Sequence, residues 1–233
     1  SNRGLERFAA IAAHDLRAPI RAMGLWVDMF ESLLAKPVDL EMEQALHFVK
    51  MNLNKSLALI QDLLEVAKVR PETSGRELVN LNQLAEQVLG TLKSEIENSH
   101  VKVAVGELPF VQGTVWQLES VLSNLIRNAL TYRDKSRQPE ISIGYKEMPQ
   151  CFLFRVADNG IGIAPENQKR IFEMFERLHS DEEYPGTGIG LALCKKVVES
   201  WGGEICVDSA VGKGTSFFFT YPKESSANER KSA

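Results

Sequence analysis

Two glycine-containing stretches have the composition of a nucleotide-binding site. Residues 158–162 read Asp-Asn-Gly-Ile-Gly, and residues 186–190 read Gly-Thr-Gly-Ile-Gly. Gly188 and Gly190 open an apolar helical stretch, where backbone N–H groups and the helix dipole can receive a phosphate. Neither stretch has the spacing of GxGxxG or GxxxxGK[ST], which argues against a Rossmann or P-loop site. A nucleotide pocket built from these stretches would therefore be of another kind, and for either stretch taken alone an ordinary turn is the alternative.

A second set of polar residues follows a helical spacing. Asn124, Asn128 and Tyr132 are four residues apart, so they share one face of a helix predicted over residues 114–133. Amide side chains on a core helix need hydrogen-bond partners. Asparagine oxygens are also hard ligands that suit Mg²⁺ held jointly with phosphates. This helix face is a candidate phosphate and metal site.

A third candidate is a histidine in a long helical pattern near the start of the chain. His14 points away from the apolar stripe of that pattern. Asp15 can orient the imidazole or accept its proton, which makes the ring a better nucleophile. Pro19 leaves the Asp15 carbonyl without its helical partner, at a cost of about 3 kcal/mol in a helix interior. The pattern suggests a reactive site that bends; a tolerated kink is the alternative.

The N-terminal elements form a helical pair. Apolar residues recur at alternating steps of three and four over residues 5–34, which predicts a long helix. A break at 36–39 precedes a second helical stripe over residues 42–67. Two helices cannot cover all of their apolar surface, so we expect a four-helix bundle built from two chains. The alternative is a monomeric hairpin packed on its own C-terminal domain.

The periodicity becomes mixed beyond a linker-like stretch at residues 70–75. Helices are predicted over residues 80–98, 114–133, 165–176 and 188–201. Strands are predicted over residues 101–105, 140–147, 151–157, 204–208 and 215–221. Several strands follow one another directly, which favours an α+β layered domain over a parallel doubly wound sheet.

Composition excludes several classes of protein. The net charge of −4 gives no support for binding to nucleic acid or to an anionic membrane. No apolar run approaches the roughly 20 residues of a membrane segment, and Ser1 does not begin a secretory leader. The three cysteines lack CxxC spacing, so neither a disulfide framework nor a zinc site is indicated. We therefore expect a cytoplasmic protein.

The order of the motifs resembles the transmitter region of sensor histidine kinases. The matching stretches are residues 14–19 (His-Asp-Leu-Arg-Ala-Pro), the Asn124/Asn128 box, residues 158–162, residues 171–175 (Ile-Phe-Glu-Met-Phe) and residues 186–190. The resemblance covers residues 5 to about 222, and the motifs are specific as an ordered set, although none is specific alone.

The resemblance implies an α+β multidomain architecture. Residues 1–70 would form a dimerization and phosphoacceptor helical hairpin, within a dimeric four-helix bundle. Residues 71–76 would be a linker, and residues 77–222 would form a catalytic α/β sandwich of the Bergerat (GHKL) type that binds ATP. Residues 223–233 are polar and expected to be disordered.

The resemblance also implies a role for each matching residue. His14 would be the phosphoacceptor and Asp15 its general base. Asn128 would coordinate Mg²⁺ on the triphosphate of ATP, and Asp158 would accept a hydrogen bond from the adenine amino group. The other implied contacts are Asn124 and Tyr132 in the nucleotide site, Gly160 and Gly162 against the ring, Gly186, Thr187, Gly188 and Gly190 as a phosphate lid, Gly212 and Gly214 as the last glycine element, and Arg177 against the γ-phosphate.

The implied reaction is ATP-dependent autophosphorylation of His14, followed by transfer to an aspartate of a response regulator receiver domain. The implied partners are a second copy of the chain, bound through the hairpin, and an upstream sensor module outside this fragment.

Two positions depart from the pattern of the family. Thr131 stands where many members have a lysine before the tyrosine; Arg127 and Arg133 are nearby cations that could compensate. Ala18 stands where members that dephosphorylate their regulator often have Thr or Asn, so we expect weak phosphatase activity.

Two other functions compete with kinase activity. An ATPase of the gyrase or Hsp90 type shares the nucleotide fold, but it uses a glutamate to activate water where Asn124 stands, and an amide is no base at pH 7. A non-catalytic dimeric scaffold with a degenerate nucleotide domain is supported by Thr131 alone, and a nucleotide titration with Mg²⁺ separates it from an enzyme.

Overall fold

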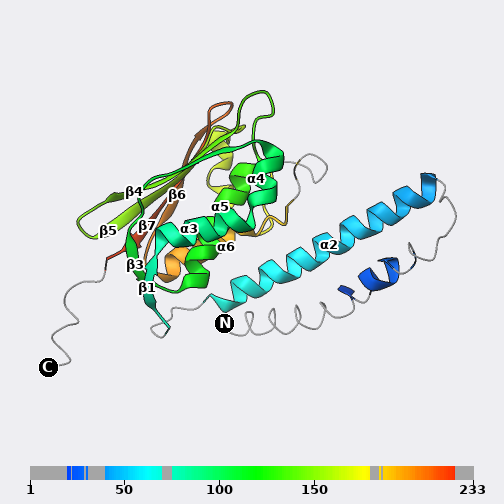
Figure 1. Cartoon of the computed structure of the whole chain (residues 1–233), viewed down its shortest axis with the longest axis horizontal. Coiled ribbons are helices and arrows are strands. Elements are labelled where there is room, and N and C mark those ends of the chain that lie inside the picture. The colour runs from blue at the N-terminus through cyan, green and yellow to red at the C-terminus, as the bar shows by residue number, and fades with distance from the viewer. Residues whose placement is uncertain are drawn as a thin grey trace. The chain divides into compact units, whose positions relative to one another are not determined.

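The chain divides into two compact units, Ser1–Lys68 and Val69–Ala233 (Figure 1). The computed structural model describes residues 20–21, 23–28, 30, 40–69, 75–178, 184 and 186–223. His14, Asp15 and Ala18 lie outside the described residues, and so does most of the predicted linker. None of the described helices combines the length and apolar character that a membrane crossing requires.

The first unit contains two helical segments that lie side by side. The described residues between 20 and 30 are helical, and α2 spans Leu40–Lys68, which confirms the second predicted helix. A Cβ atom on Gly24 would lie 2.7 Å from Leu53 Cδ2, so glycine permits a close approach of the two segments. Lys50 Nζ lies 3.1 Å from Asp28 Oδ1. These pairs run in opposite directions along the two segments, as in a hairpin.

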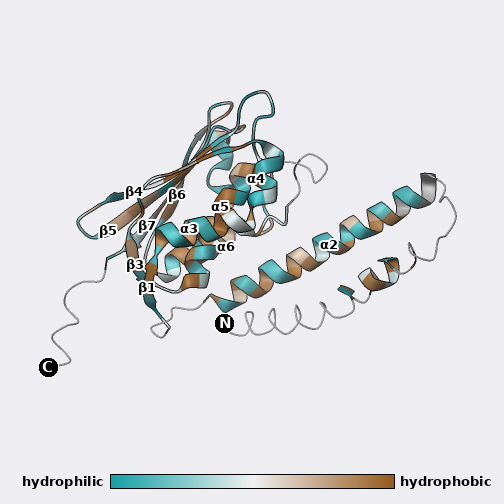
Figure 2. Cartoon of the chain, in the orientation of Figure 1, coloured by the Kyte–Doolittle hydropathy of each residue, from teal (hydrophilic) through white to brown (hydrophobic). Residues whose placement is uncertain are grey.

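Large apolar side chains of the first unit remain exposed in a single chain. Trp26 is 64% exposed and Leu25 is 65% exposed, and hydrophobic residues (brown) recur along α2 in Figure 2. The other exposed apolar residues of this unit are Met23, Phe30, Phe48, Val49 and Met51. Apolar surface of this extent marks an interaction face.

A mixed five-stranded sheet forms one layer of the second unit. Its strand order is β2-β4-β5-β7-β6, with β2–β4 parallel and the other pairs antiparallel. The strands are β2 Lys102–Val105, β4 Glu140–Glu147, β5 Cys151–Asp158, β6 Ile205–Ala210 and β7 Gly214–Pro222. All five were predicted from alternating apolar residues, and the mixed pairing confirms the α+β class.

A small second sheet was not predicted. β1 (Glu77–Asn80) pairs antiparallel with β3 (Phe110–Gly113). Each strand has four residues, and β1 runs directly into α3. Such short strands show too little alternation to be recognised from periodicity.

Helices pack on one face of the large sheet and form the second layer (Figure 1). They are α3 Leu81–Thr91, α4 Lys93–Ser99, α5 Val115–Thr131 and α6 Gly190–Ser200. Leu125 and Ile126 of α5 and Val197 of α6 are fully buried. On the sheet, the rings of Phe154 and Phe219 stack with centroids 5.0 Å apart. The core between the layers fixes where α5 and β5 end, and both ends border the site.

The prediction of a helix over residues 165–176 is wrong. Two short 3-10 turns occupy this stretch, Pro165–Asn167 and Arg170–Phe172. Phe175 then adopts φ +66°, and its N–H donates to the Gly188 carbonyl at 2.9 Å. Pairing with a distant glycine competes with the helical hydrogen bonds, so tertiary contacts override local propensity here.

Candidate nucleotide site

A pocket of about 590 Å³ opens in the second unit, beside the ends of α5 and β5. Five predicted site residues from separate parts of the chain line it: Asn128, Tyr132, Asp158, Gly162 and Arg177. Its full lining is Asn128, Tyr132, Asp158, Ile161, Gly162, Ile163, Ile171, Glu176, Arg177, Leu178, Leu191, Thr215 and Phe217. The lining combines apolar walls with a few polar groups, as in most small-molecule sites.

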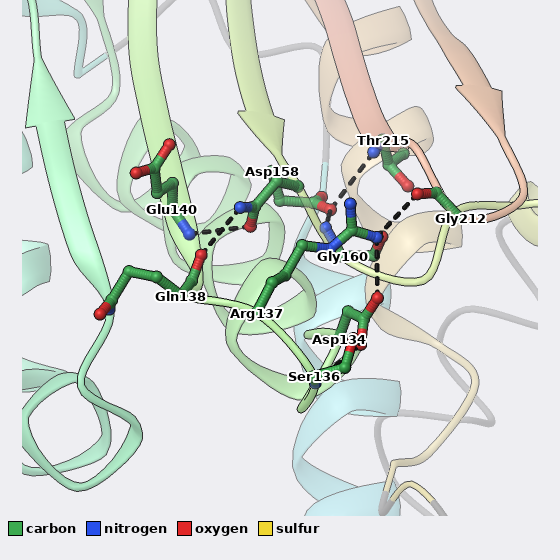
Figure 3. A network of polar contacts seen from close by, with 10 residues as sticks. Asp134, Ser136, Arg137, Gln138, Glu140, Asp158, Gly160, Gly212 and Thr215 are labelled. Carbon is green, nitrogen blue, oxygen red and sulfur yellow. Dashed lines mark hydrogen bonds and ion pairs between the residues drawn. The ribbon is translucent and has the colours of Figure 1, made fainter.

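Asp158 ends β5 with one carboxylate oxygen held by the protein. Oδ1 accepts hydrogen bonds from the N–H groups of Gly160 at 2.8 Å and Thr215 at 3.2 Å (Figure 3). Oδ2 accepts no hydrogen bond from the residues that the structure describes. Burial raises the pKa of Asp158 to about 6, while the two N–H donors lower it. At neutral pH the carboxylate is ionised, with an acceptor available to an amino group.

The raised pKa of Asp158 predicts pH-dependent binding of adenosine. Protonation below about pH 6 turns the open oxygen into a hydroxyl donor, which opposes the donor of an adenine amino group. Adenosine carries no titrating phosphate, so a calorimetric titration with adenosine isolates this carboxyl. We expect affinity to be constant from about pH 8 to about pH 7 and to fall as pH drops through about 6. An affinity that stays flat down to about pH 5 would contradict this assignment.

Asn128 and Tyr132 reach the pocket from the last turn of α5. The Asn128 Nδ2 atom is buried and has no hydrogen-bond partner among the described residues. An unpaired buried amide costs free energy, so this side chain suits a further polar group in the pocket. The Tyr132 ring packs on Tyr184 with centroids 5.1 Å apart. Burial raises the pKa of Tyr132, which keeps its phenol neutral.

Asn124 lies one turn before Asn128 on α5 and is not among the residues that line the pocket. Its Nδ2 donates to the Ser120 carbonyl at 2.9 Å. Its Oδ1 faces Gly190, where an added Cβ would lie 2.6 Å from that oxygen. Asn124 therefore contacts the first residue of α6, and Gly190 is small because the two helices meet there.

The first glycine turn is packed against protein backbone. A Cβ on Gly160 would overlap the Tyr132 carbonyl oxygen, and one on Gly162 would overlap the Ala210 carbonyl oxygen. Gly162 also has φ +74°, a conformation that glycine adopts at low cost. These two glycines let the turn approach α5 and the end of β6, which positions Asp158.

Gly214 and Gly212 allow a matched test of this close packing. Both have positive φ, at +94° and +75°, so alanine at either position costs about 1–2 kcal/mol in backbone strain. Only at Gly214 would the new Cβ also overlap a backbone atom, the Asp158 carbonyl oxygen; at Gly212 nothing lies within 4 Å. We expect Gly214→Ala to lower the free energy of unfolding by several kcal/mol and Gly212→Ala by about 1–2 kcal/mol. Urea denaturation measures both, and equal losses would contradict the packing argument.

The predicted lid residues border the start of α6. Gly188 has φ +74°, and its carbonyl accepts the Phe175 N–H. Thr187 Oγ1 accepts the Ile189 N–H at 3.3 Å. The helix begins at Gly190 without a side-chain cap, so its first N–H groups remain available to an anion. The four predicted lid residues, Gly186, Thr187, Gly188 and Gly190, are all among the described residues, and none of them lines the pocket.

Arg177 is the one cation among the described pocket-lining residues. Its Nη2 donates to the Tyr184 carbonyl at 2.7 Å. The two cations considered as substitutes for the family's lysine face elsewhere. Arg127 pairs with Glu95 at 3.2 Å, and Arg133 donates to the Leu130 carbonyl at 2.7 Å. Thr131 itself bonds back to its own helix at the Arg127 carbonyl.

Sequence reasoning missed several residues of the site. Phe217 forms part of its apolar wall, but its sequence pattern is that of an ordinary core residue, and Ile171 was part of a matching motif without being assigned to the pocket. Thr215 supplies an N–H to Asp158 from a strand far along the chain. Glu176 was also missed; it is held by Arg170, whose Nη2 lies 3.1 Å from both carboxylate oxygens. Besides Ile171, only Thr215 of these residues lies in a stretch whose composition pointed to the site, Gly-Lys-Gly-Thr at residues 212–215.

Comparison with known proteins identifies the family. Residues 113–225 match the profile described as "Histidine kinase-, DNA gyrase B-, and HSP90-like ATPase". Cyanobacterial phytochrome A of Nostoc sp. is 35% identical over 231 residues, which cover 99% of this chain and 30% of that protein. The adaptive-response sensory kinase SasA of Synechocystis sp. is 31% identical over 228 residues, covering 93% of this chain and 59% of that protein. These matches identify the chain as a transmitter region of the sensor histidine kinase type.

Solved structures agree with this assignment. The catalytic domain of the histidine kinase ThkA is 26% identical with a TM-score of 0.56, covering 64% of this chain and 95% of that domain. Full-length ShkA, solved in complex with AMPPNP, has the same fold with a TM-score of 0.71 at 23% identity, covering 93% of this chain and 45% of that one. The chain spans about 30% of the length of the phytochrome relatives. It has the sequence and fold of a transmitter region with an ATP-binding domain.

Proposed function

We propose that this transmitter region autophosphorylates His14 with ATP and passes the phosphoryl group to an aspartate of a response regulator. One observation carries the proposal: Asn128, Asp158 and Arg177 line a single pocket although separate elements supply them. An acceptor for an amino group, an unpaired amide and a cation match the base, the metal-bound phosphates and the terminal phosphate of ATP. The whole protein's input signal would come from a sensor module upstream.

In the proposed mechanism the pocket positions ATP and neutralises charge. Asp158 Oδ2 accepts a hydrogen bond from the adenine amino group. When bound, Mg²⁺ supplies charge neutralisation to the phosphates, and Asn128 is the residue that would hold it. The uncapped start of α6 and Arg177 orient the terminal phosphate. These contacts act by positioning, which is the main source of catalysis in phosphoryl transfer.

The chemical step forms one bond and breaks one. An imidazole nitrogen of His14 attacks the γ-phosphorus, the bond from that phosphorus to the β–γ bridging oxygen breaks, and ADP leaves. Asp15 accepts the ring proton. In the second reaction a receiver carboxylate attacks the same phosphorus, the N–P bond breaks, and the leaving nitrogen takes up a proton, which returns the imidazole to its neutral form.

The proposal assigns residues 1–70 to a dimerization hairpin and residues 71–76 to a linker that carries the catalytic domain, 77–222. The exposed apolar side chains of the first unit support a homodimer, because two hairpins together can cover them. A bundle of this kind would present His14 to the nucleotide domain in one signalling state. Because Ala18 stands where Thr or Asn is frequent in members that dephosphorylate their regulator, we still predict weak phosphatase activity for this chain.

The site geometry favours phosphoryl transfer to protein over hydrolysis. A hydrolytic enzyme of this fold needs a carboxylate base beside the metal ligand. Asn124 stands there, with its amide bound to its own helix. The carboxylates among the described pocket residues are Asp158, whose Oδ1 is held by backbone N–H groups and whose Oδ2 is assigned to the adenine amino group, and Glu176, which is paired with Arg170. Neither is placed as a free base.

The proposal is tested by incubating the purified chain with γ-labelled ATP and Mg²⁺. We expect label on the protein that is lost in acid and retained in base, as a phosphoramidate requires, and transferred on addition of the cognate receiver domain. Release of inorganic phosphate without labelled protein would favour the ATPase function instead.

Replacing Asn128 by alanine should reduce autophosphorylation at least about 100-fold, since the phosphate-side ligand is removed. The dependence of ADP affinity on Mg²⁺ should disappear as well. Asn98→Ala is a matched control, because that asparagine is exposed on α4. Calorimetric titrations of ADP with and without Mg²⁺ measure the effect, and a metal dependence that survives in the Asn128 variant would remove this residue from the metal site.

A further inference from the structure

Two backbone turns form the Asp158 end of the pocket, and they are fastened to each other. The first turn is residues 158–162 and the second is residues 210–214. The Gly212 N–H donates to the Ile161 carbonyl at 2.7 Å. A Cβ on Gly162 would overlap the Ala210 carbonyl oxygen, so the two backbones are in direct contact. The position of Asp158 therefore depends on how the two turns are spaced.

Arg137 joins these two turns through a single nitrogen. Its Nη2 lies 2.7 Å from the Gly212 carbonyl oxygen and 3.2 Å from the Gly160 carbonyl oxygen (Figure 3). The same nitrogen lies 2.8 Å from Asp134 Oδ2. Hydrogen bonds from a charged donor are stronger than neutral ones, and here one guanidinium ties three segments together.

The third segment connects Arg137 to α5. Asp134 follows the end of α5, and its Oδ1 accepts bonds from the Ser136 N–H at 2.9 Å and the Ser136 hydroxyl at 2.6 Å. The Ser136 bonds, with a contribution from Arg137, lower the pKa of Asp134 and keep it ionised. The first turn also meets this end of α5 directly, because the Ile161 N–H donates to the Tyr132 carbonyl at 3.0 Å. The helix end that carries Asn128 and Tyr132 is thus linked to both turns.

Arg137 donates hydrogen bonds to the two turns through Nη2, but another nitrogen of its side chain has no partner within the described structure. Its Nε is buried with no hydrogen-bond partner in the part of the chain that the structure describes. A buried unpaired donor lowers stability. The side chain therefore lies where Nη2 reaches the two carbonyl oxygens, although this position leaves Nε without a partner among the described residues.

We propose that Arg137 is a positioning residue that sets the spacing of the two turns and so aims the Asp158 carboxylate at an adenine base. It does not touch the nucleotide. The proposal rests on the proposed function for its effect on ATP, while the effect on the turns themselves is independent of that function.

The test uses Arg137→Ala, with Arg155→Ala as a matched control. Arg155 is exposed on β5, outside the pocket lining, and bonds Ser216 Oγ at 3.1 Å. We expect the Arg137 variant to bind ADP about tenfold more weakly and to show faster amide exchange confined to residues 158–163 and 210–214. Millimolar methylguanidinium should restore affinity by refilling the site. Arg137→Lys keeps the charge but loses the planar fork, so its affinity should be intermediate.

Unchanged ADP affinity in Arg137→Ala would overturn the proposal, and so would faster exchange spread evenly over the second unit, which indicates a general loss of stability. If the unmodified chain binds no ADP, the proposed function fails instead. In that case, faster exchange confined to the two turns of Arg137→Ala would still support the role of Arg137 in spacing them, and unchanged exchange would refute that role.

Discussion

Replacing Asp158 by asparagine should strongly weaken ATP binding and leave the fold intact. The amide has the size of the carboxyl group, and its oxygen can keep the bonds from the Gly160 and Thr215 N–H groups. Its NH₂ group then occupies the place of Oδ2 and presents a donor to the adenine amino group, which is also a donor. Two unpaired donors in a closed site should weaken binding at least about 100-fold.

The stability of the Asp158→Asn variant should not fall with its affinity. Burial raises the folded-state pKa of Asp158 to about 6, above its ordinary value. Such a group stabilises the fold while protonated and loses that contribution as pH rises through about 6. At neutral pH the ionised carboxylate therefore costs stability in the nucleotide-free protein, and a neutral amide relieves the cost. Thermal unfolding at neutral pH should show an equal or higher midpoint.

A change of base preference gives a sharper readout than loss of binding. Inosine nucleotides carry a carbonyl oxygen in place of the adenine amino group, so the asparagine NH₂ should donate to it. We expect IDP to bind the variant better than ADP does, with the reverse order for the unmodified chain. An Asp158→Asn variant that retains the affinity and preference for ADP would remove this residue from base recognition.

Much of the site followed from patterns that local geometry dictates. Asn128 and Tyr132 share a helix face because their spacing is four residues, and both reach the pocket. Asp158 was recognised because an acidic residue ends an apolar strand and leads a glycine turn. These positions depend on the periods of helix and strand, which the sequence displays directly.

The remaining parts depend on contacts between distant segments. The stretch after Pro165 has a helical pattern, yet Phe175 pairs with Gly188 and the helix does not form. Asn124 contacts Gly190 at the start of α6, and its helical spacing gives no sign of that contact. Arg137 lies in a polar loop whose composition gives no hint that two carbonyl groups will meet there. Local sequence patterns do not predict contacts between residues that are distant in the sequence.

Replacing His14 by glutamine should eliminate phosphorylation of the chain while nucleotide affinity stays unchanged. Glutamine is polar and close in size to histidine, but its amide is not a nucleophile at neutral pH. The pocket belongs to the second unit, so its affinity for ADP should not depend on a residue of the first unit. The expected loss is complete, since no other group is proposed to accept the phosphoryl group.

The other histidines provide the controls. The chain has four histidines, and two of the others lie exposed in the described structure: His47 on α2 and His100 after α4. Exposed imidazoles are the groups that nonspecific phosphorylation would reach. His47→Gln and His100→Gln should therefore label like the unmodified chain.

The most direct test of the central claim is the acid-labile label from γ-labelled ATP, measured side by side in the unmodified chain, His14→Gln, His47→Gln and His100→Gln, with ADP affinity measured on each. We expect label in every protein except His14→Gln, and equal ADP affinity in all four. Acid-labile label that persists in His14→Gln would contradict the claim that this pocket serves phosphorylation of His14.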